Sequence, residues 1–270
     1  MLKRLLKKSR GDSKDPGEVC DVKVAVIGQP NVGKSTLFNI LTGKLVRVGN
    51  FPGTTVSMTI GVKRYRDKNF CFVDLPGIYS LKPSSSEEKI SRDYLLFGDW
   101  DLVLVLVDPL IGPEAFYLAI QVLQITSRVV IALTKWDEVE RSGLRIDLEK
   151  IRRSLGVPVV AVSALKKIGL EDLMEKLYEA SEKSFRENVL VIDYGDLENV
   201  IKPLEEKISR IINSKISPRG VAVLIAMGDR ELVSKLGVER DLVDSLANQS
   251  SLEDLFAETM YRYTREVVAN

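Results

Sequence analysis

The residue types between positions 28 and 35 have the spacing of a phosphate-binding loop. An apolar, β-branched run leads into Gly28, and Gly33, Lys34 and Ser35 complete the pattern G-x-x-x-x-G-K-[ST]. In such a loop backbone N–H groups and a helix N-terminus face phosphate oxygens, the lysine neutralises their charge and the serine hydroxyl binds Mg²⁺. A merely structural turn would not need the Lys-Ser pair. The candidate phosphate-contacting residues are Gly28, Gln29, Pro30, Asn31, Val32, Gly33, Lys34, Ser35 and Thr36.

A carboxylate and a glycine follow another apolar run, in the string Phe72-Val73-Asp74-Leu75-Pro76-Gly77. Asp74 at the carboxyl end of a strand could hold Mg²⁺ through water, and the Gly77 amide could contact a γ-phosphate. A D-x-P-G string on its own is also a common surface turn. Its place one hairpin after a phosphate-binding loop favours the functional interpretation.

A third group of residues could recognise a guanine base. In Thr134-Lys135-Trp136-Asp137 the Asp137 carboxylate can accept hydrogen bonds from N1–H and the 2-amino group of guanine, which adenine cannot supply. Lys135 would lie along the base plane, and a backbone amide of Ser163-Ala164-Leu165 would face the guanine oxygen. An aspartate that merely opens a helix is the alternative for this short string. The order of all the motifs along the chain favours guanine.

The composition excludes several other chemistries. The chain has 270 residues and no histidine, so Ser-His-Asp hydrolysis, histidine-ligated zinc and histidine general-base catalysis are excluded. The net charge of +1 supplies no general attraction for nucleic acid, and we expect no nucleic-acid partner. Two cysteines, Cys20 and Cys71, cannot build a disulfide framework and indicate a reducing compartment. No apolar run approaches the roughly 20 residues of a membrane-spanning helix.

The elements that must position these residues follow a βα rhythm from position 21 to position 184. The pattern predicts an α/β fold with a mostly parallel six-stranded sheet flanked by helices. We expect strands at 22–27, 59–65, 70–74, 102–108, 129–134 and 158–163, and helices at 34–42, 87–96, 113–125, 147–155 and 170–184. Polar residues between the second and third strands predict an antiparallel hairpin.

The pattern changes after Phe185. An extended piece at 189–194 precedes helical periodicity that runs to the end with an interruption at 217–220, which predicts an all-α subdomain of three to five helices. Charged residues at 231–254 interleave with apolar ones and indicate solvated faces. We expect the basic segment 1–20 to be a flexible tail; contact of a short basic helix with an anionic membrane is the alternative.

Longer strings resemble the ferrous iron transport protein B (FeoB) family. Residues 49–56, GNFPGTTV, are similar to its switch I string G-N-W-P-G-V-T-V, with Phe51 in place of tryptophan. Residues 74–81, DLPGIYSL, resemble its D-L-P-G-x-Y-S-L string, residues 87–94 its E-x-I-x-R-D-Y helix, and Tyr117, Leu118 and Gln121 its L-Y-L-x-x-Q helix. The resemblance implies a Ras-like P-loop GTPase domain at 21–186 and a helical, GDI-like domain at 187–270.

The resemblance also implies a function. The family's cytosolic region binds GTP and GDP, hydrolyses GTP with Mg²⁺ and acts as a nucleotide switch that regulates ferrous iron uptake. We therefore expect a membrane-embedded iron-permeation domain C-terminal to this chain, an excised cytosolic portion at the cytoplasmic face of the cell membrane, and a homo-oligomer, either dimer or trimer. No cluster of soft ligands in the sequence suggests an iron site here.

Individual roles carry over onto matching positions. Thr55 would close onto Mg²⁺ together with Ser35 and Asp74, with Gly53 and Thr54 beside the nucleotide. Asn31, with the carbonyls of Gly49 and Phe51, would hold a K⁺ ion, although a loop-turn asparagine is the alternative for Asn31. The residues expected to act in catalysis are Lys34, Thr55, Gly77 and Asn31.

The chain departs from the family at Thr134 and at segment 109–116, and two other functions are the alternatives. Thr134 stands where the family has asparagine, which predicts weaker nucleotide binding, and Ile78 stands where Ras orients water with glutamine, which predicts slow intrinsic hydrolysis. Segment 109–116 also differs from the family. The alternative is a soluble GTPase of ribosome assembly or tRNA modification, but no G-x-x-G clamp or basic excess follows Phe185. A scaffold without nucleotide would not need Lys34, Ser35, Thr55 and Asp74.

Overall fold

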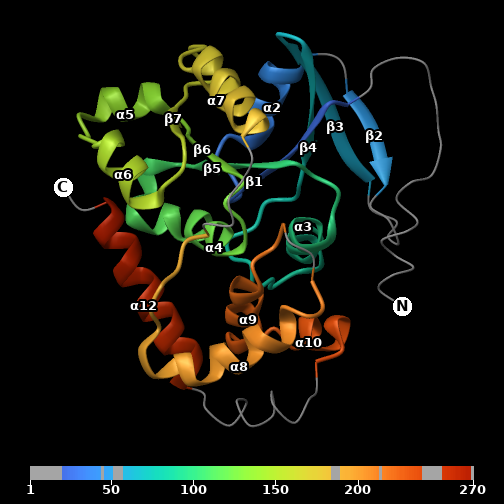
Figure 1. The fold of residues 1–270 in the computed structure, drawn as a ribbon. Helices are drawn as coiled ribbons and strands as arrows, with labels where there is room; N and C mark the ends of the chain where they lie inside the picture. The colour runs from blue at the N-terminus through green and yellow to red at the C-terminus, as the bar shows by residue number, and fades with distance from the viewer. Residues whose placement is uncertain are drawn as a thin grey trace.

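A computed structural model of the chain describes residues 20–43, 46–50, 57–183, 189–212, 215–238 and 251–268, with only the backbone at 46–50, 57 and 251–253. Figure 1 shows a twisted sheet with helices on both faces and a group of helices below it. The seven strands lie in the order β2-β3-β4-β1-β5-β6-β7. They are β1 (Val22–Gly28), β2 (Val46–Asn50), β3 (Ser57–Tyr65), β4 (Lys68–Asp74), β5 (Leu102–Val107), β6 (Val129–Leu133) and β7 (Val159–Ala161).

The sheet is mostly parallel, as predicted. Strands β4, β1, β5, β6 and β7 are parallel neighbours, whereas β3 pairs antiparallel with β4 and β2 with β3. All six predicted strands are present, and the predicted hairpin is β3–β4. The edge strand β2 was not predicted. Its five residues include Gly49 and Asn50, types that are rare in strands, so propensity did not reveal it.

Alternating side chains divide the parallel strands between two apolar layers. Val24, Leu104 and Val130 pack with helices α2 (Lys34–Thr42) and α7 (Leu170–Glu182) on one face. Ala25 and Val105 pack on the other face, against α3 (Ser86–Phe97), α4 (Tyr117–Ile125) and α6 (Leu148–Leu155). This two-sided burial explains the continuous apolar runs in the sequence.

The predicted helices are all present, with two differences near the sheet. The helix expected at 113–125 is divided into a 3₁₀ turn, η2 (Pro113–Phe116), and α4, and another 3₁₀ turn, η1 (Pro109–Ile111), precedes it. Helix α5 (Trp136–Ser142) was not predicted, because its seven residues are mostly polar and begin inside the T-K-x-D string.

The C-terminal helices share a core with the sheet. They are η3 (Gly195–Leu197), α8 (Glu198–Ile208), α9 (Pro218–Ala226), α10 (Arg230–Leu236) and α12 (Ser251–Val268). Phe256 and Met260 of α12 belong to the apolar cluster that also contains α4. The break predicted at 217–220 is present but lies earlier in the chain: α8 ends at Ile208, Ser217 caps the next helix and Pro218 opens α9. Gly220 is instead a contact point, where a Cβ would lie 2.3 Å from the Gln124 carbonyl oxygen of α4.

The two cysteines form one disulfide, Cys20–Cys71. Cys20 lies just before β1, and Cys71 lies buried in the neighbouring strand β4. The sequence analysis took the low cysteine count as a sign of a reducing compartment and did not anticipate this bond. The separation of 51 positions between the two cysteines concealed a proximity that only the pairing of β1 with β4 creates.

Candidate functional site

The phosphate-binding loop lies at the carboxyl end of the central strand. Gly28 ends β1, and a Cβ there would lie 2.9 Å from the Val32 side chain, so the loop can fold back only over a glycine. Gly33 precedes α2 with φ of 91°, a left-handed conformation that favours glycine. Asn31 is exposed and also has a positive φ, 64°. The N-terminus of α2 therefore lies next to any ligand that binds in the loop.

Lys34 and Asp74 meet directly beside this loop. Asp74 pairs with Val26 in the β1–β4 register, and its Oδ1 accepts a charged hydrogen bond from the Lys34 Nζ. The exposed Ser35 follows Lys34 on α2. A serine hydroxyl and a carboxylate are hard oxygen donors of the kind that Mg²⁺ prefers, and Mg²⁺ usually keeps several waters. Ser35 and Asp74 would leave positions for such waters. Within the described ranges, no cluster of three or more acidic or cysteine side chains could hold a metal ion.

The D-x-P-G string lies against the phosphate loop. The Ile78 N–H donates to the Gly28 carbonyl oxygen at 3.0 Å, and a Cβ on Gly77 would lie 3.1 Å from Pro30. The Ile78 side chain is fully buried in the core, whereas Tyr79 is 58% exposed. The Ile78 side chain is therefore part of the core, and it carries no group that could orient water.

Helix α3 holds the segment after Gly77. Glu88 accepts hydrogen bonds from the Ser84 N–H and hydroxyl at 2.7 and 2.6 Å and from the Tyr79 N–H at 3.3 Å. Burial alone would raise the pKa of Glu88, but these donors hold it below its usual value. The Ser91 hydroxyl also donates to the Pro76 carbonyl oxygen at 2.7 Å. These hydrogen bonds were not predicted, because the sequence around Glu88 does not show which groups its carboxylate will bind.

The T-K-x-D string and the loop after β7 meet at the other end of the site. The Ser163 hydroxyl donates to the Asp137 Oδ1 at 2.6 Å, and this bond lowers the pKa of Asp137. Lys135 has a left-handed backbone and pairs with the buried Asp108 at 2.6 Å. A cavity between these elements is lined by Gly33, Thr36, Lys135, Asp137, Ala164 and Leu165. Residues from the phosphate loop, the T-K-x-D string and the β7 loop therefore share one cavity.

Thr134 also lines this cavity, and it is buried. Its buried hydroxyl is 2.7 Å from the Val32 carbonyl oxygen of the phosphate loop and 3.2 Å from that of Val107. A hydroxyl has one proton, and the shorter distance assigns it to Val32. Thr134 thus ties the T-K-x-D string to the phosphate loop.

Some expected site residues cannot be placed. Phe51, Gly53, Thr54 and Thr55 lie outside the described residues. Gly49 lies in β2 opposite Met58, so its backbone is part of the sheet edge.

Comparison with known proteins identifies the family to which this chain belongs. The family model described as "Ferrous iron transport protein B" matches residues 22–177. The Fe(2+) transporter FeoB of Methanocaldococcus jannaschii is 38% identical over 241 residues, which are 85% of this chain and 35% of that protein. The chain belongs to the FeoB family. Its Legionella pneumophila relative is 30% identical over 262 residues, 33% of that protein, so the chain spans about a third of these two FeoB proteins.

Solved FeoB structures have the same fold. The cytosolic domain of the T. maritima FeoB iron transporter in a GDP form is 37% identical and superposes with a TM-score of 0.80, covering 93% of this chain and 98% of that one. Its GMPPNP form gives a TM-score of 0.79 at 37% identity, covering 91% and 97%. The predicted P-loop GTPase fold followed by helices is therefore confirmed for this FeoB chain.

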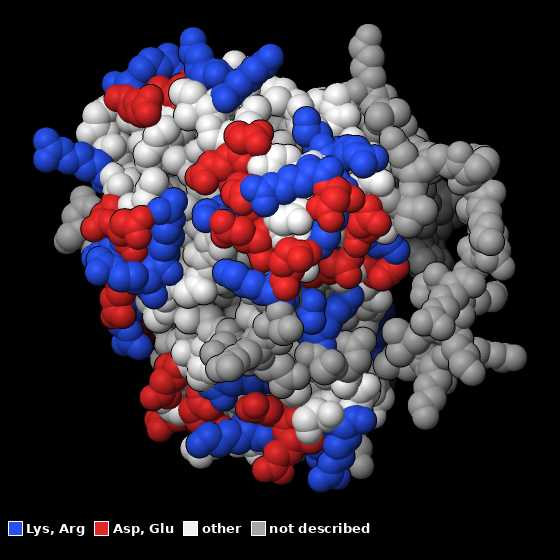
Figure 2. Space-filling view, turned by 45° about the horizontal axis from the view of Figure 1, so that its top comes forward, with Lys and Arg blue, Asp and Glu red and all other residues white. Residues whose placement is uncertain are grey.

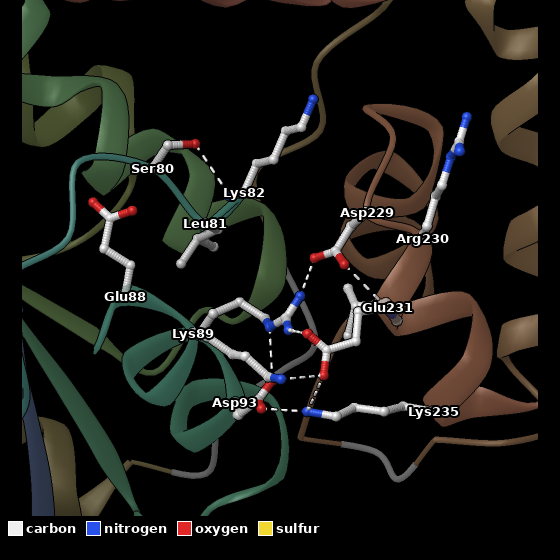
Figure 3. A network of polar contacts seen from close by, with 12 residues as sticks. Ser80, Leu81, Lys82, Glu88, Lys89, Asp93, Asp229, Arg230, Glu231 and Lys235 are labelled. Carbon is white, nitrogen blue, oxygen red and sulfur yellow. Dashed lines mark hydrogen bonds and ion pairs between the residues drawn. The ribbon is translucent and has the colours of Figure 1, made fainter. Parts of the chain in front are cut away.

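In this FeoB chain a buried ion-pair network joins α3 to α10. Arg92 of α3 is 0% exposed and binds the carboxylates of Asp93, Asp229 and Glu231. Figure 3 shows Lys235 reaching back to Asp93, and Lys89 pairing with Glu231. Glu231 was expected on a solvated face. Its side chain is 37% exposed and also pairs with Arg92 of α3, so it lies at the solvent edge of this network. The helix after Gly77 is thereby bound to the C-terminal helices.

The charged surface offers no large region of one sign on the face drawn in Figure 2, where acidic and basic side chains are intermixed. This distribution agrees with the net charge of +1 and gives a polyanion no evident footprint on that face. Among the described residues no helix is both long and apolar enough to cross a bilayer.

Proposed function

We propose that this chain binds GTP and GDP and hydrolyses GTP, as the cytosolic part of a ferrous iron transporter. The observation that carries the proposal is the shared cavity. Asp137, whose carboxylate is proposed to bind guanine, lies at one end, and the phosphate loop lies at the other. The FeoB relatives are named as Fe(2+) transporters, and the solved FeoB domains are named for GDP and GMPPNP. A membrane-embedded permeation domain would follow the chain at the cytoplasmic face of the membrane, and the whole protein would assemble as a dimer or trimer.

The described residues supply most of the chemistry of GTP hydrolysis. The Lys34 ammonium, now paired with Asp74, would move onto the terminal phosphates, and the Gly77 N–H would donate to the γ-phosphate. A water attacks the γ-phosphorus and the bond to the β-γ bridging oxygen breaks, which yields GDP and phosphate. Ser35, Thr55 and Asp74 would hold Mg²⁺, which when bound would supply positive charge beside the phosphates.

We also propose that K⁺ stimulates the reaction. Ile78 is buried and leaves no side chain at its position to orient water, and no arginine lies between positions 49 and 56 to stabilise the transition state. Asn31 is exposed on the phosphate loop, where its amide oxygen could hold a cation together with the carbonyls of Gly49 and Phe51.

Single-turnover GTP hydrolysis tests both proposals. The unmodified protein should hydrolyse GTP, and do so about tenfold or more faster in K⁺ than in Na⁺. Asn31→Ala should abolish the difference, while Asn39→Ala, an exposed asparagine on α2, should keep it. Ser35→Ala should slow hydrolysis in both salts. Equal rates in the two salts would reject the K⁺ site, and no hydrolysis in either would reject the enzymatic function.

A second test concerns Thr134. Thr134→Val keeps the shape of the side chain but leaves the Val32 carbonyl without its donor, so we expect GDP affinity to fall about tenfold, equivalent to roughly 1.4 kcal/mol. Thr134→Ser retains the hydroxyl and should bind GDP nearly as well as the unmodified protein. Isothermal titration calorimetry measures both. Unchanged affinity in Thr134→Val would show that the tie to the phosphate loop does not matter for binding.

We further propose the domain organisation expected from the sequence: a tail at 1–20, a G domain at 21–186 and a GDI-like helical domain at 187–270. The Arg92 network supports a regulatory role for the helical domain, because it binds the helix that carries Glu88 and Ser91. A helical domain bound there would favour one position of the segment after Gly77.

A further inference from the structure

Helix α4 carries two buried glutamines, one turn apart, that face different parts of the molecule. The Gln121 Oε1 accepts a hydrogen bond from the Leu81 N–H at 2.8 Å. The Gln124 Oε1 accepts one from the Tyr194 hydroxyl at 2.9 Å, and its Nε2 lies 3.3 Å from the Met260 Sδ of α12. Gln121 thus contacts the segment after Gly77, whereas Gln124 contacts the C-terminal helices.

The two glutamines also differ in how many of their polar atoms have a hydrogen-bond partner. Both the Oε1 and the Nε2 of Gln124 have one. Gln121 is only 3% exposed, yet its Nε2 has no hydrogen-bond partner within the described part of the chain. A buried donor without an acceptor costs on the order of 1–3 kcal/mol.

The hydrogen bond from the Leu81 N–H to Gln121 lies at the end of a short segment, residues 78–81, that is held at both ends. Segment 78–81 is held at its start by the Ile78 N–H on the Gly28 carbonyl and at its end by the Leu81 N–H on Gln121. The side chains of Ile78 and Leu81 are fully buried, while Tyr79 between them is exposed. The segment is therefore fixed to the phosphate loop at one end and to α4 at the other.

We propose that Gln121 is a positioning residue for this segment in both nucleotide states. Its Oε1 holds the Leu81 N–H in the conformation described here, and its Nε2 donates to a main-chain carbonyl of segment 78–82 when the segment moves with the γ-phosphate. A carboxamide offers an acceptor and a donor on one side chain, so it can hold the segment in two registers. The inference rests on the proposed GTP function, because the γ-phosphate is what moves the segment.

Nucleotide affinities separate this role from simple packing. Gln121→Met fills the same space but replaces the carboxamide with a thioether, which has no donor and only a weak acceptor, and Gln124→Met is the matched control on the same helix. Both variants should lower the melting temperature. Gln121→Met should change the ratio of GMPPNP to GDP affinity by about fivefold or more, whereas Gln124→Met should leave the ratio within about twofold. Equal ratios in Gln121→Met and the unmodified protein would overturn the inference.

A measurement on the unmodified protein serves if Gln121→Met does not fold. In amide-nitrogen NMR spectra the Gln121 side-chain NH₂ signal should shift when GMPPNP replaces GDP, because Nε2 gains an acceptor, while the Gln124 signal should stay in place. A Gln121 signal that is the same with both nucleotides contradicts the inference even if GTP is bound and hydrolysed. A protein that binds neither nucleotide would overturn the proposed function and this inference with it.

Discussion

Asp137→Asn should convert a guanine-binding protein into one that prefers xanthine nucleotides. The proposed role gives this carboxylate two hydrogen bonds from guanine, each worth roughly 1.5–3 kcal/mol when one partner is charged, so GTP affinity should fall about 10²- to 10⁴-fold. An amide can donate to the 2-oxo group of xanthine, and XTP should bind instead. Competition between GTP and XTP for the purified variant measures the change.

The hydrogen bond from Ser163 supplies a control for this prediction. Ser163→Ala leaves the Asp137 carboxylate in place but removes the donor that lowers its pKa, so guanine preference should persist with a smaller loss of affinity. Equal affinity of the unmodified protein for ATP and GTP would contradict the role of Asp137 altogether.

Arg92→Met should cause the largest loss of stability among the variants considered. Arg92 is wholly buried, and Asp229 beside it is 5% exposed, so the substitution leaves a buried carboxylate without its cation. Such a loss costs about 3–5 kcal/mol. The melting temperature, followed by circular dichroism, should fall markedly relative to the unmodified protein.

Two further variants show whether burial is the cause. Lys89→Met removes another cation from the same network, but Lys89 is 43% exposed, so the change should cost less than about 1 kcal/mol. Adding Asp229→Asn to Arg92→Met removes the unpaired charge and should recover part of the loss. A melting temperature for Arg92→Met as high as that for Lys89→Met would mean that the network contributes little.

The local parts of the candidate site could be predicted from the sequence. The phosphate loop is one contiguous string whose conformation depends on its own glycines, and Gly33 indeed has the positive φ that the turn requires. The strands were also predictable, because burial on both faces leaves an apolar run of definite length, as in Leu102–Val107. The sequence by itself therefore determined the Ras-like architecture and the positions of the phosphate loop and the T-K-x-D string along it.

The contacts between distant segments were decided only by the tertiary structure. Arg92 and Asp229 are 137 positions apart, and Thr134 and Val32 are 102 apart. Their meeting depends on the order of strands in the sheet and on the direction in which each helix turns its side chains. No local pattern records that geometry. For the same reason the Cys20–Cys71 disulfide, the edge strand β2 and the bond between Gln121 and Leu81 became visible only in the folded chain.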